Sequence, residues 1–150
     1  MLDVLLVEDD EIDAEAFRRL VTKRFSFCRD IHHCTDGAAA LEFLQQHDFS
    51  GQTVPMVIAL DLNMPGMNGL SFLQELRESP FKSLPVFMLS SSKHPRDIEE
   101  TYKHNVAGYF CKVQLAALLK LLEIMDSDGQ HPLIGSAHSS ALNAGQINAI

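Results

Sequence analysis

The stretch VLLVEDDEIDAE, residues 4–15, runs from an apolar segment directly into six carboxylates within eight positions. The segment Val4–Val7 is continuously apolar, as is typical of a parallel strand covered on both faces. Beyond the acids, apolar residues recur at helical spacing, at Ile12, Ala16, Phe17, Leu20 and Val21. The stretch therefore predicts a β-strand and an α-helix joined by a short acidic turn.

The same alternation repeats along the chain. Short apolar runs predict four more strands, at 30–34, 56–60, 86–89 and 108–111. Helical patterns follow these strands, the first opening at the N-cap Asp36 and the others lying at about 70–76, 96–105 and 114–125. Five β-α units in strict alternation predict an α/β fold, a doubly wound five-stranded parallel sheet with helices on both faces.

Composition narrows the class of protein. A chain of 150 residues with 46% apolar and 21% charged residues fits one soluble domain with a substantial core. The net charge of −8 disfavours binding to nucleic acid or to an anionic membrane. No apolar run approaches the roughly 18 residues of a membrane span, and the first residues lack the basic segment of a signal peptide. Three cysteines without C-x-x-C spacing indicate reduced thiols, so we expect a cytoplasmic protein.

The composition changes after residue 125. Residues 126–150 are rich in Ser, Gly, Ala and Asn, and about 25 residues cannot bury a core of their own. We therefore expect one domain at 1–125 and a C-terminal tail at 126–150.

Polar residues follow four of the predicted strands directly. Glu8 and Asp9 follow the first strand, Asp61 the third, Ser90 the fourth and Lys112 the fifth. In open α/β sheets, ligands bind just beyond the carboxyl ends of the strands, so these side chains should lie close together. Clustered carboxylates with only oxygen ligands around them suit a hard divalent cation such as Mg²⁺. The sequence therefore predicts a magnesium site at this edge.

The remaining acids of the first turn have simpler interpretations. Glu11, Asp13 and Glu15 fall in the first turns of a helix, where the helix dipole favours negative charge. A calcium-binding loop is excluded, because its glycine position holds Ala14 and its closing glutamate position holds Leu20.

The ordered set of motifs resembles the receiver domain of two-component response regulators. It comprises the acidic pair after the first strand, DLNMPGMNG at 61–69, Ser90 after the fourth strand and Lys112 after the fifth. The resemblance covers about residues 2–125. It implies a flavodoxin-like sheet with strand order 2-1-3-4-5.

The resemblance also implies roles for residues at the strand ends. Asp61 would be the phosphoacceptor, attacking a phosphohistidine of a sensor histidine kinase. Mg²⁺ would be bound by Asp9 and Asp61 directly, by the backbone carbonyl of Asn63, and by Glu8 through water. Lys112 would pair with the phosphoryl oxygens.

Two further residues would form a switch. Ser90 would hydrogen-bond the phosphoryl group, and Tyr109 would turn inward when Ser90 moves. One position departs from the family pattern, because Val113 stands where proline usually follows the lysine.

The implied function is that of a single-domain response regulator that signals by binding a downstream protein. Such a protein is not an enzyme, although it assists its own phosphorylation and dephosphorylation. Two alternatives remain: a pseudo-receiver that never carries phosphate, and a Mg²⁺-dependent phosphohydrolase with an aspartate nucleophile. The second needs a D-x-D motif, but Asn63 stands where its second aspartate belongs.

The resemblance also suggests partners. The polar helix at 96–105 and the lysine without a following proline are similar to stand-alone regulators paired with bacteriophytochromes. On the predicted fifth helix, Leu121 and Ile124 extend the apolar arc beyond the width that covering a sheet requires. Either the tail covers them or two chains form a homodimer through this helix.

Overall fold

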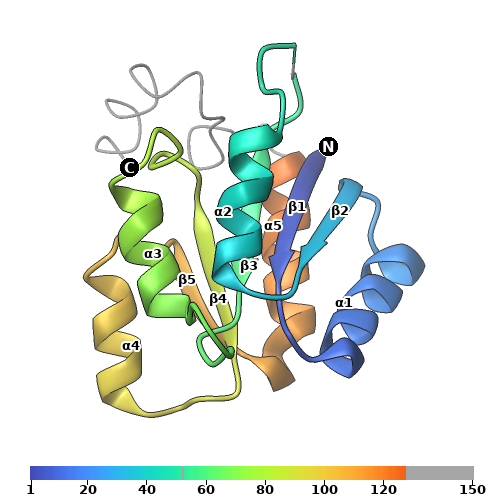
Figure 1. Ribbon diagram of the computed structural model, residues 1–150. Coiled ribbons are helices and arrows are strands. Elements are labelled where there is room, and N and C mark those ends of the chain that lie inside the picture. The colour runs from blue at the N-terminus through green and yellow to red at the C-terminus, as the bar shows by residue number, and fades with distance from the viewer. Residues whose placement is uncertain (52, 128–150) are drawn as a thin grey trace.

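A computed structural model describes residues 1–51 and 53–127, where five strands alternate with five α-helices (Figure 1). The strands are β1 (Leu2–Val7), β2 (Cys28–Cys34), β3 (Met56–Leu60), β4 (Val86–Ser90) and β5 (Gly108–Cys111). The helices are α1 (Glu11–Arg24), α2 (Gly37–Gln46), α3 (Gly69–Arg77), α4 (Pro95–Tyr102) and α5 (Leu115–Ser127). All strand pairs are parallel and the order is β2-β1-β3-β4-β5. The predicted fold is therefore confirmed.

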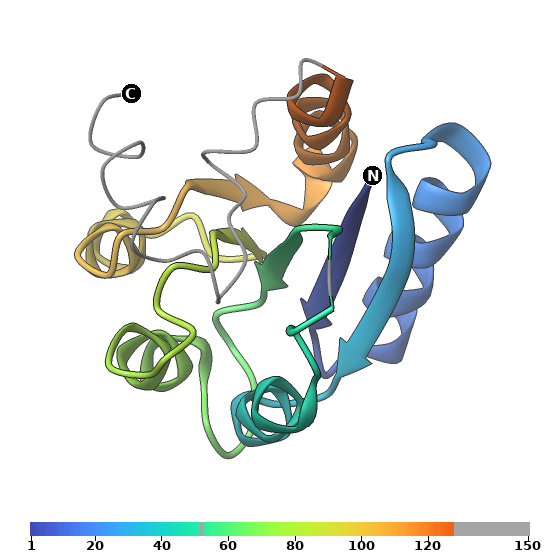
Figure 2. The ribbon, with the colours of Figure 1, turned by 90° about the horizontal axis from the view of Figure 1, so that it is seen from above.

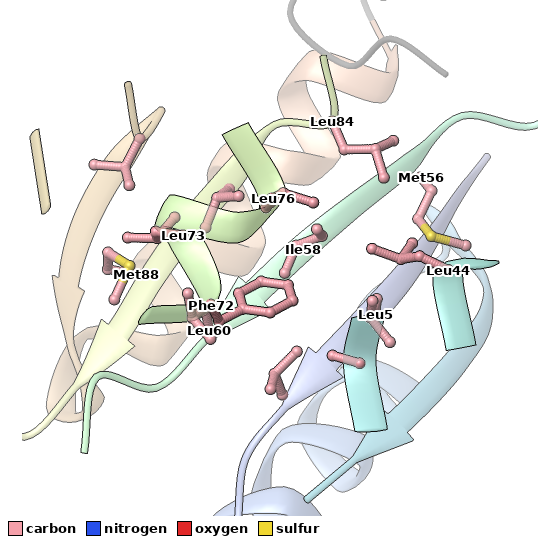
Figure 3. Close-up of a cluster of buried hydrophobic side chains, with 14 of the residues drawn as sticks. Leu5, Leu44, Met56, Ile58, Leu60, Phe72, Leu73, Leu76, Leu84 and Met88 are labelled. Carbon is pink, nitrogen blue, oxygen red and sulfur yellow. The ribbon is translucent and has the colours of Figure 1, made fainter. Parts of the chain in front are cut away.

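The sheet separates two hydrophobic layers, and Figure 2 shows the helices distributed over both of its faces. Alternate residues of a strand point to opposite faces, so Leu5 and Val7 join the layer with α2 and α3, while Val4 and Leu6 join that with α1 and α5. Figure 3 shows the first layer, in which Phe72 and the leucines of α3 pack over β3 and β4. Burial on both faces explains why the central strands read as continuous apolar runs.

The predicted apolar face of the first helix was wrong at Ile12, which is 80% exposed. The side chain of Asp10 caps α1 by accepting a hydrogen bond from the Ile12 amide at 2.8 Å, which fixes where the helix begins. Each residue turns the helix by about 100°, so the face carrying the buried Ala14 and Phe17 leaves Ile12 on the opposite side.

The end of α5 lies two residues beyond the predicted domain boundary. Met125 is buried, and the Oδ1 atom of Asp126 lies 2.7 Å from the amino group of Met1. Leu121 is partly buried against the layer of α1 and α5, whereas Ile124 is 47% exposed. Of the predicted tail, residues 128–150 lie outside the described part of the chain. None of the helices described at 1–51 and 53–127 has the length and apolar character needed to cross a membrane.

Candidate functional site

The central strands deliver two buried carboxylates to the same edge of the sheet. Val7 and Leu60 are paired in register, so Glu8 and Asp61 leave neighbouring strands side by side. Their backbones stay in the sheet pattern: the Glu8 amide donates to the Cys34 carbonyl at 2.9 Å, and the Asp61 amide donates to the Val7 carbonyl at 3.0 Å. Both side chains are almost completely buried, which makes their charges expensive unless partners neutralise them.

The loop between β3 and α3 folds tightly back on Asp61. A Cβ atom added to Gly69 would lie 2.6 Å from the carbonyl oxygen of Asp61 and 2.8 Å from Cα of Leu62. Only glycine fits this close approach. The Gly69 amide also donates to the Leu62 carbonyl at 2.9 Å, and the Asn68 side chain caps α3. The start of α3 thereby fixes the backbone that carries Asp61.

Three carboxylates form a group that could hold a metal ion. Ligand atoms of Glu8, Asp9 and Asp61 all lie within 4.8 Å of one another, with Asp9 exposed to solvent. The Oδ1 atom of Asp61 is buried and finds no hydrogen-bond partner among the described residues, which is rare for a buried polar atom. Asn63 lies two residues further, exposed in the β3–α3 loop. An oxygen-only donor set with an unpaired buried oxygen fits a hard divalent cation.

Lys112 reaches this group from the end of β5. Its Nζ atom lies 2.7 Å from Oε1 of Glu8, 2.6 Å from Oδ2 of Asp13 and 3.5 Å from Oδ2 of Asp61. The sequence interpretation left Asp13 among the helix-dipole acids. The sequence indicated only that Asp13 lies in the first helical turn after the acidic loop, residues 8–10. Glu11 lies in the same turn, so this feature does not distinguish the two residues.

These contacts shift the ionisation of the groups involved. Burial raises the pKa of Glu8 to about 8; the hydrogen bond from Lys112 opposes this rise, and the nearby Asp61 adds to it. The hydrogen bond from Lys112 lowers the pKa of Asp13. Burial acts to lower the pKa of Lys112, but hydrogen bonds to Asp13 and Glu8 outweigh it, so the pKa lies above its usual value. The lysine therefore stays charged at neutral pH.

Ser90 ends β4, and Tyr109 lies in the neighbouring strand β5, in register with Met88. Ser90 is completely buried, and its hydroxyl accepts a hydrogen bond from the Ser92 amide at 3.3 Å. The hydroxyl of the partly buried Tyr109 donates to the Ser92 carbonyl at 2.8 Å. The tyrosine is thus bonded to the loop that Ser90 begins. Every peptide bond between the described residues is trans, including the one that joins Lys112 to Val113.

A histidine on the edge strand supports the acidic loop, and no sequence motif indicated it. The Nδ1 atom of His33 lies 2.8 Å from a guanidinium nitrogen of Arg18, and Nε2 lies 2.7 Å from the carbonyl oxygen of Glu8. Arginine is always a donor, so Nδ1 accepts and Nε2–H donates to Glu8. His33 therefore holds the backbone of the turn that carries the metal-capable acids.

Comparison with known proteins gives a consistent family. Residues 4–123 match the model described as the response regulator receiver domain. The response regulator Rcp1 of Synechocystis sp. is 32% identical over 127 residues, which span 83% of this chain and 86% of that protein.

Solved structures of related proteins also match the fold. The Mn²⁺-bound form of Rcp1 aligns with a TM-score of 0.67 at 30% identity, covering 85% of this chain and 93% of that chain. The phosphorylated cyanobacterial phytochrome response regulator RcpA aligns with a TM-score of 0.66 at 28% identity, covering 83% and 91%. The bacteriophytochrome response regulator RtBRR aligns with a TM-score of 0.64 at 34% identity, covering 81% and 78%.

Proposed function

The chain belongs to the response regulator receiver family, and from this premise we propose that Asp61 is the phosphoacceptor of a signalling switch. The observation that carries the proposal is the buried, unpaired Oδ1 atom of Asp61, which lies in a carboxylate beside the Lys112 ammonium. A carboxylate oxygen without a hydrogen bond keeps its lone pairs free for attack on phosphorus.

The transfer is a displacement at phosphorus. An oxygen of Asp61 forms a bond to the phosphorus of a phosphohistidine, while the bond from that phosphorus to the imidazole nitrogen breaks and the nitrogen keeps the electron pair. Lys112 lies close enough to pair with the transferred oxygens, whose charge it would help to neutralise. The product is an acyl phosphate on Asp61.

A divalent cation is the cofactor of this proposal. Asp9 and Asp61 would bind it directly, together with the backbone carbonyl of Asn63, and Glu8 would act through water. Mg²⁺ in this place would supply positive charge to the phosphoryl oxygens. Support comes from the oxygen-only donor set and from the relative Rcp1, whose crystal structure is that of a Mn²⁺-bound form.

The output of the switch would pass through Ser90 and Tyr109. A phosphoryl group on Asp61 would accept a hydrogen bond from the Ser90 hydroxyl, which would move the loop beyond β4. The Tyr109 hydroxyl is bonded to that loop at the Ser92 carbonyl, so its ring would follow. The changed surface would bind a downstream protein.

We also propose the kind of kinase that phosphorylates Asp61. RcpA is a cyanobacterial phytochrome response regulator and RtBRR is a bacteriophytochrome response regulator, which supports a bacteriophytochrome-type sensor histidine kinase as the phosphodonor. A second chain, paired through α5 at Ile124, is a further proposed partner, motivated by the exposure of that side chain.

Acetyl phosphate with Mg²⁺ tests the assignment of Asp61. We expect the parent chain to take up an acid-stable, base-labile label, and Asp61→Asn to take up none. Asp48→Asn, an exposed aspartate in the loop after α2, is the matched control and should label like the parent.

Other outcomes identify the alternatives. Equal labelling of Asp61→Asn and the parent would show that another residue is the acceptor. Continuous release of phosphate without a stable label would indicate the phosphohydrolase, and an absence of any reaction would indicate a pseudo-receiver.

A further inference from the structure

We propose that Asp13 is a positioning residue that competes with the phosphoryl group of Asp61 for the ammonium of Lys112. The inference rests on the proposed function, because it concerns the same phosphoacceptor. Asp13 would thereby set how readily Lys112 assists phosphorylation.

The geometry places the ammonium nearer to Asp13 than to the phosphoacceptor. The distance from Nζ of Lys112 is 2.6 Å to Oδ2 of Asp13 but 3.5 Å to Oδ2 of Asp61. The third carboxylate at the ammonium is Glu8, at 2.7 Å. The ammonium is therefore held by two acidic side chains other than the one that receives phosphate.

Asp13 differs from the neighbouring acids in two ways. It lies outside the metal-capable group of Glu8, Asp9 and Asp61, so a bound cation leaves it free to hold the lysine. Its side chain is also 40% exposed, so its charge carries a much smaller desolvation cost than that of Glu8, which is 4% exposed. Asp13 therefore remains available to Lys112 when a cation is bound.

Space beside the ammonium allows it to move. A cavity of about 60 Å³ is lined by Asp13, Asp61 and Lys112 together with apolar side chains, of which Ala16 and Ala59 are small. Close packing normally prevents buried side chains from changing position. Here the lysine has room to turn from Asp13 toward Asp61 by rotating its own side chain.

Phosphorylation of Asp61 changes which of the two positions the Lys112 ammonium favours, the one at Asp13 or the one at Asp61. With acetyl phosphate, an oxygen of Asp61 bonds to phosphorus while the bond from phosphorus to the acetate oxygen breaks, and acetate leaves with the electron pair. The single negative charge of the Asp61 carboxylate is replaced by a phosphoryl group with a charge of about −1.5 to −2, so the site becomes more negative. Lys112 is drawn to its oxygens, and the contact with Asp13 opposes that movement.

The test compares Asp13→Asn with Glu11→Gln, which removes the same charge from an exposed acid in the same helical turn. At saturating Mg²⁺ and limiting acetyl phosphate, we expect Asp13→Asn to accelerate labelling of Asp61 by about 1.5- to 5-fold, the range expected for one partly exposed ion pair. Glu11→Gln should stay near the parental rate, and Asp13→Glu, which keeps the charge, should do so too.

A second experiment, in a chain that carries Lys112→Met, separates a positioning role of Asp13 from general effects on charge or folding. In Lys112→Met, the substitution Asp13→Asn should no longer change the labelling rate, because the residue on which it acts is gone. A persistent acceleration in that background, a rate no higher than that of Glu11→Gln, or a slower rate would each overturn the role of Asp13. Failure of the parent chain to label at Asp61 would instead overturn the proposed function, and this inference with it.

Discussion

His32 is a single side chain whose surroundings should make stability depend on pH. It lies on the edge strand β2, with its ring centroid 4.9 Å from that of Phe43 and 5.6 Å from that of His47. Its Nε2 atom is buried and has no hydrogen-bond partner among the described residues. Burial lowers the pKa of His32, and the nearby His47 acts in the same direction. The folded chain therefore favours the neutral ring.

We expect the contribution of His32 to the free energy of unfolding to fall as the pH decreases below about 6.5. The pKa of His32 is lower in the folded chain than the 6.5 of an unperturbed histidine, so its contribution is present above that value and lost as the pH falls through the folded pKa. Urea unfolding at about pH 7.5 and about pH 5.5 measures the effect. His32→Gln, which cannot titrate, lacks this contribution, so its stability relative to the parent should rise between the higher and the lower pH.

The exposed His94 provides the control for this measurement. His94→Asn keeps a side chain able to cap α4 and should retain the parental pH dependence. If His32→Gln shows the same change in stability with pH as the parent, His32 does not contribute to the pH dependence.

At the same scale, the sequence predicted the site residues that end strands and missed those that reach it sideways. Asp61 and Lys112 could be placed, because topology alone brings the carboxyl ends of parallel strands together. Asp13 and His33 could not, because their contacts depend on the rotation of α1 and on which face of β2 meets the acidic loop.

Among the elements, the β3–α3 connection constrains the site most directly. The first residue of α3 presses against the backbone of Asp61, with a separation that leaves no room for a side chain at Gly69. The position of the phosphoacceptor is therefore tied to the position of a whole helix.

Gly69→Ala should disturb both stability and the acidic site. The added methyl group meets backbone atoms, which cannot move aside as a flexible side chain can. We expect a loss of roughly 1–3 kcal/mol in urea unfolding, as for other overpacked positions. Displacement of Asp61 should also weaken Mn²⁺ binding, measured by electron paramagnetic resonance.

Gly51→Ala is the matched control, because an added Cβ at Gly51 meets no atom within 4 Å. It should leave both measurements close to parental. Equal behaviour of the two glycine variants would mean that α3 can shift without carrying Asp61 with it.

Strand limits show why element boundaries were harder to predict than element types. Apolar periodicity placed the first strand at Val4, but β1 begins at Leu2 and includes Asp3, which is completely buried. Arg29 donates two hydrogen bonds to that carboxylate from β2, one of them 2.9 Å long. A charge neutralised by a neighbouring strand looks like a strand end in sequence, because its partner lies 26 residues away.

For the molecule as a whole, α5 offers the surface through which two chains could pair. The apolar face predicted from sequence is smaller in the folded chain, because Leu121 packs partly against the layer of α1 and α5. Ile124 remains 47% exposed. Pairing two α5 helices would bury Leu121 and Ile124 of both chains. Full burial of one such side chain contributes roughly 1.5–3 kcal/mol, and each of these side chains would contribute only part of that, because it is already partly buried.

We therefore expect weak self-association, with a dissociation constant of about 10–1,000 µM. Sedimentation of the chain with and without acetyl phosphate measures it, and Ile124→Glu should abolish it by placing a charge in the contact. Ile12→Glu makes the same change at an exposed isoleucine on α1 and should not affect association. A chain ending at Ser127 tests the competing idea that residues 128–150 cover Ile124, since their removal would then strengthen pairing. If every form stays monomeric near 1 mM, with and without phosphodonor, α5 is not a pairing surface, because even the weakest expected dimer would be populated there.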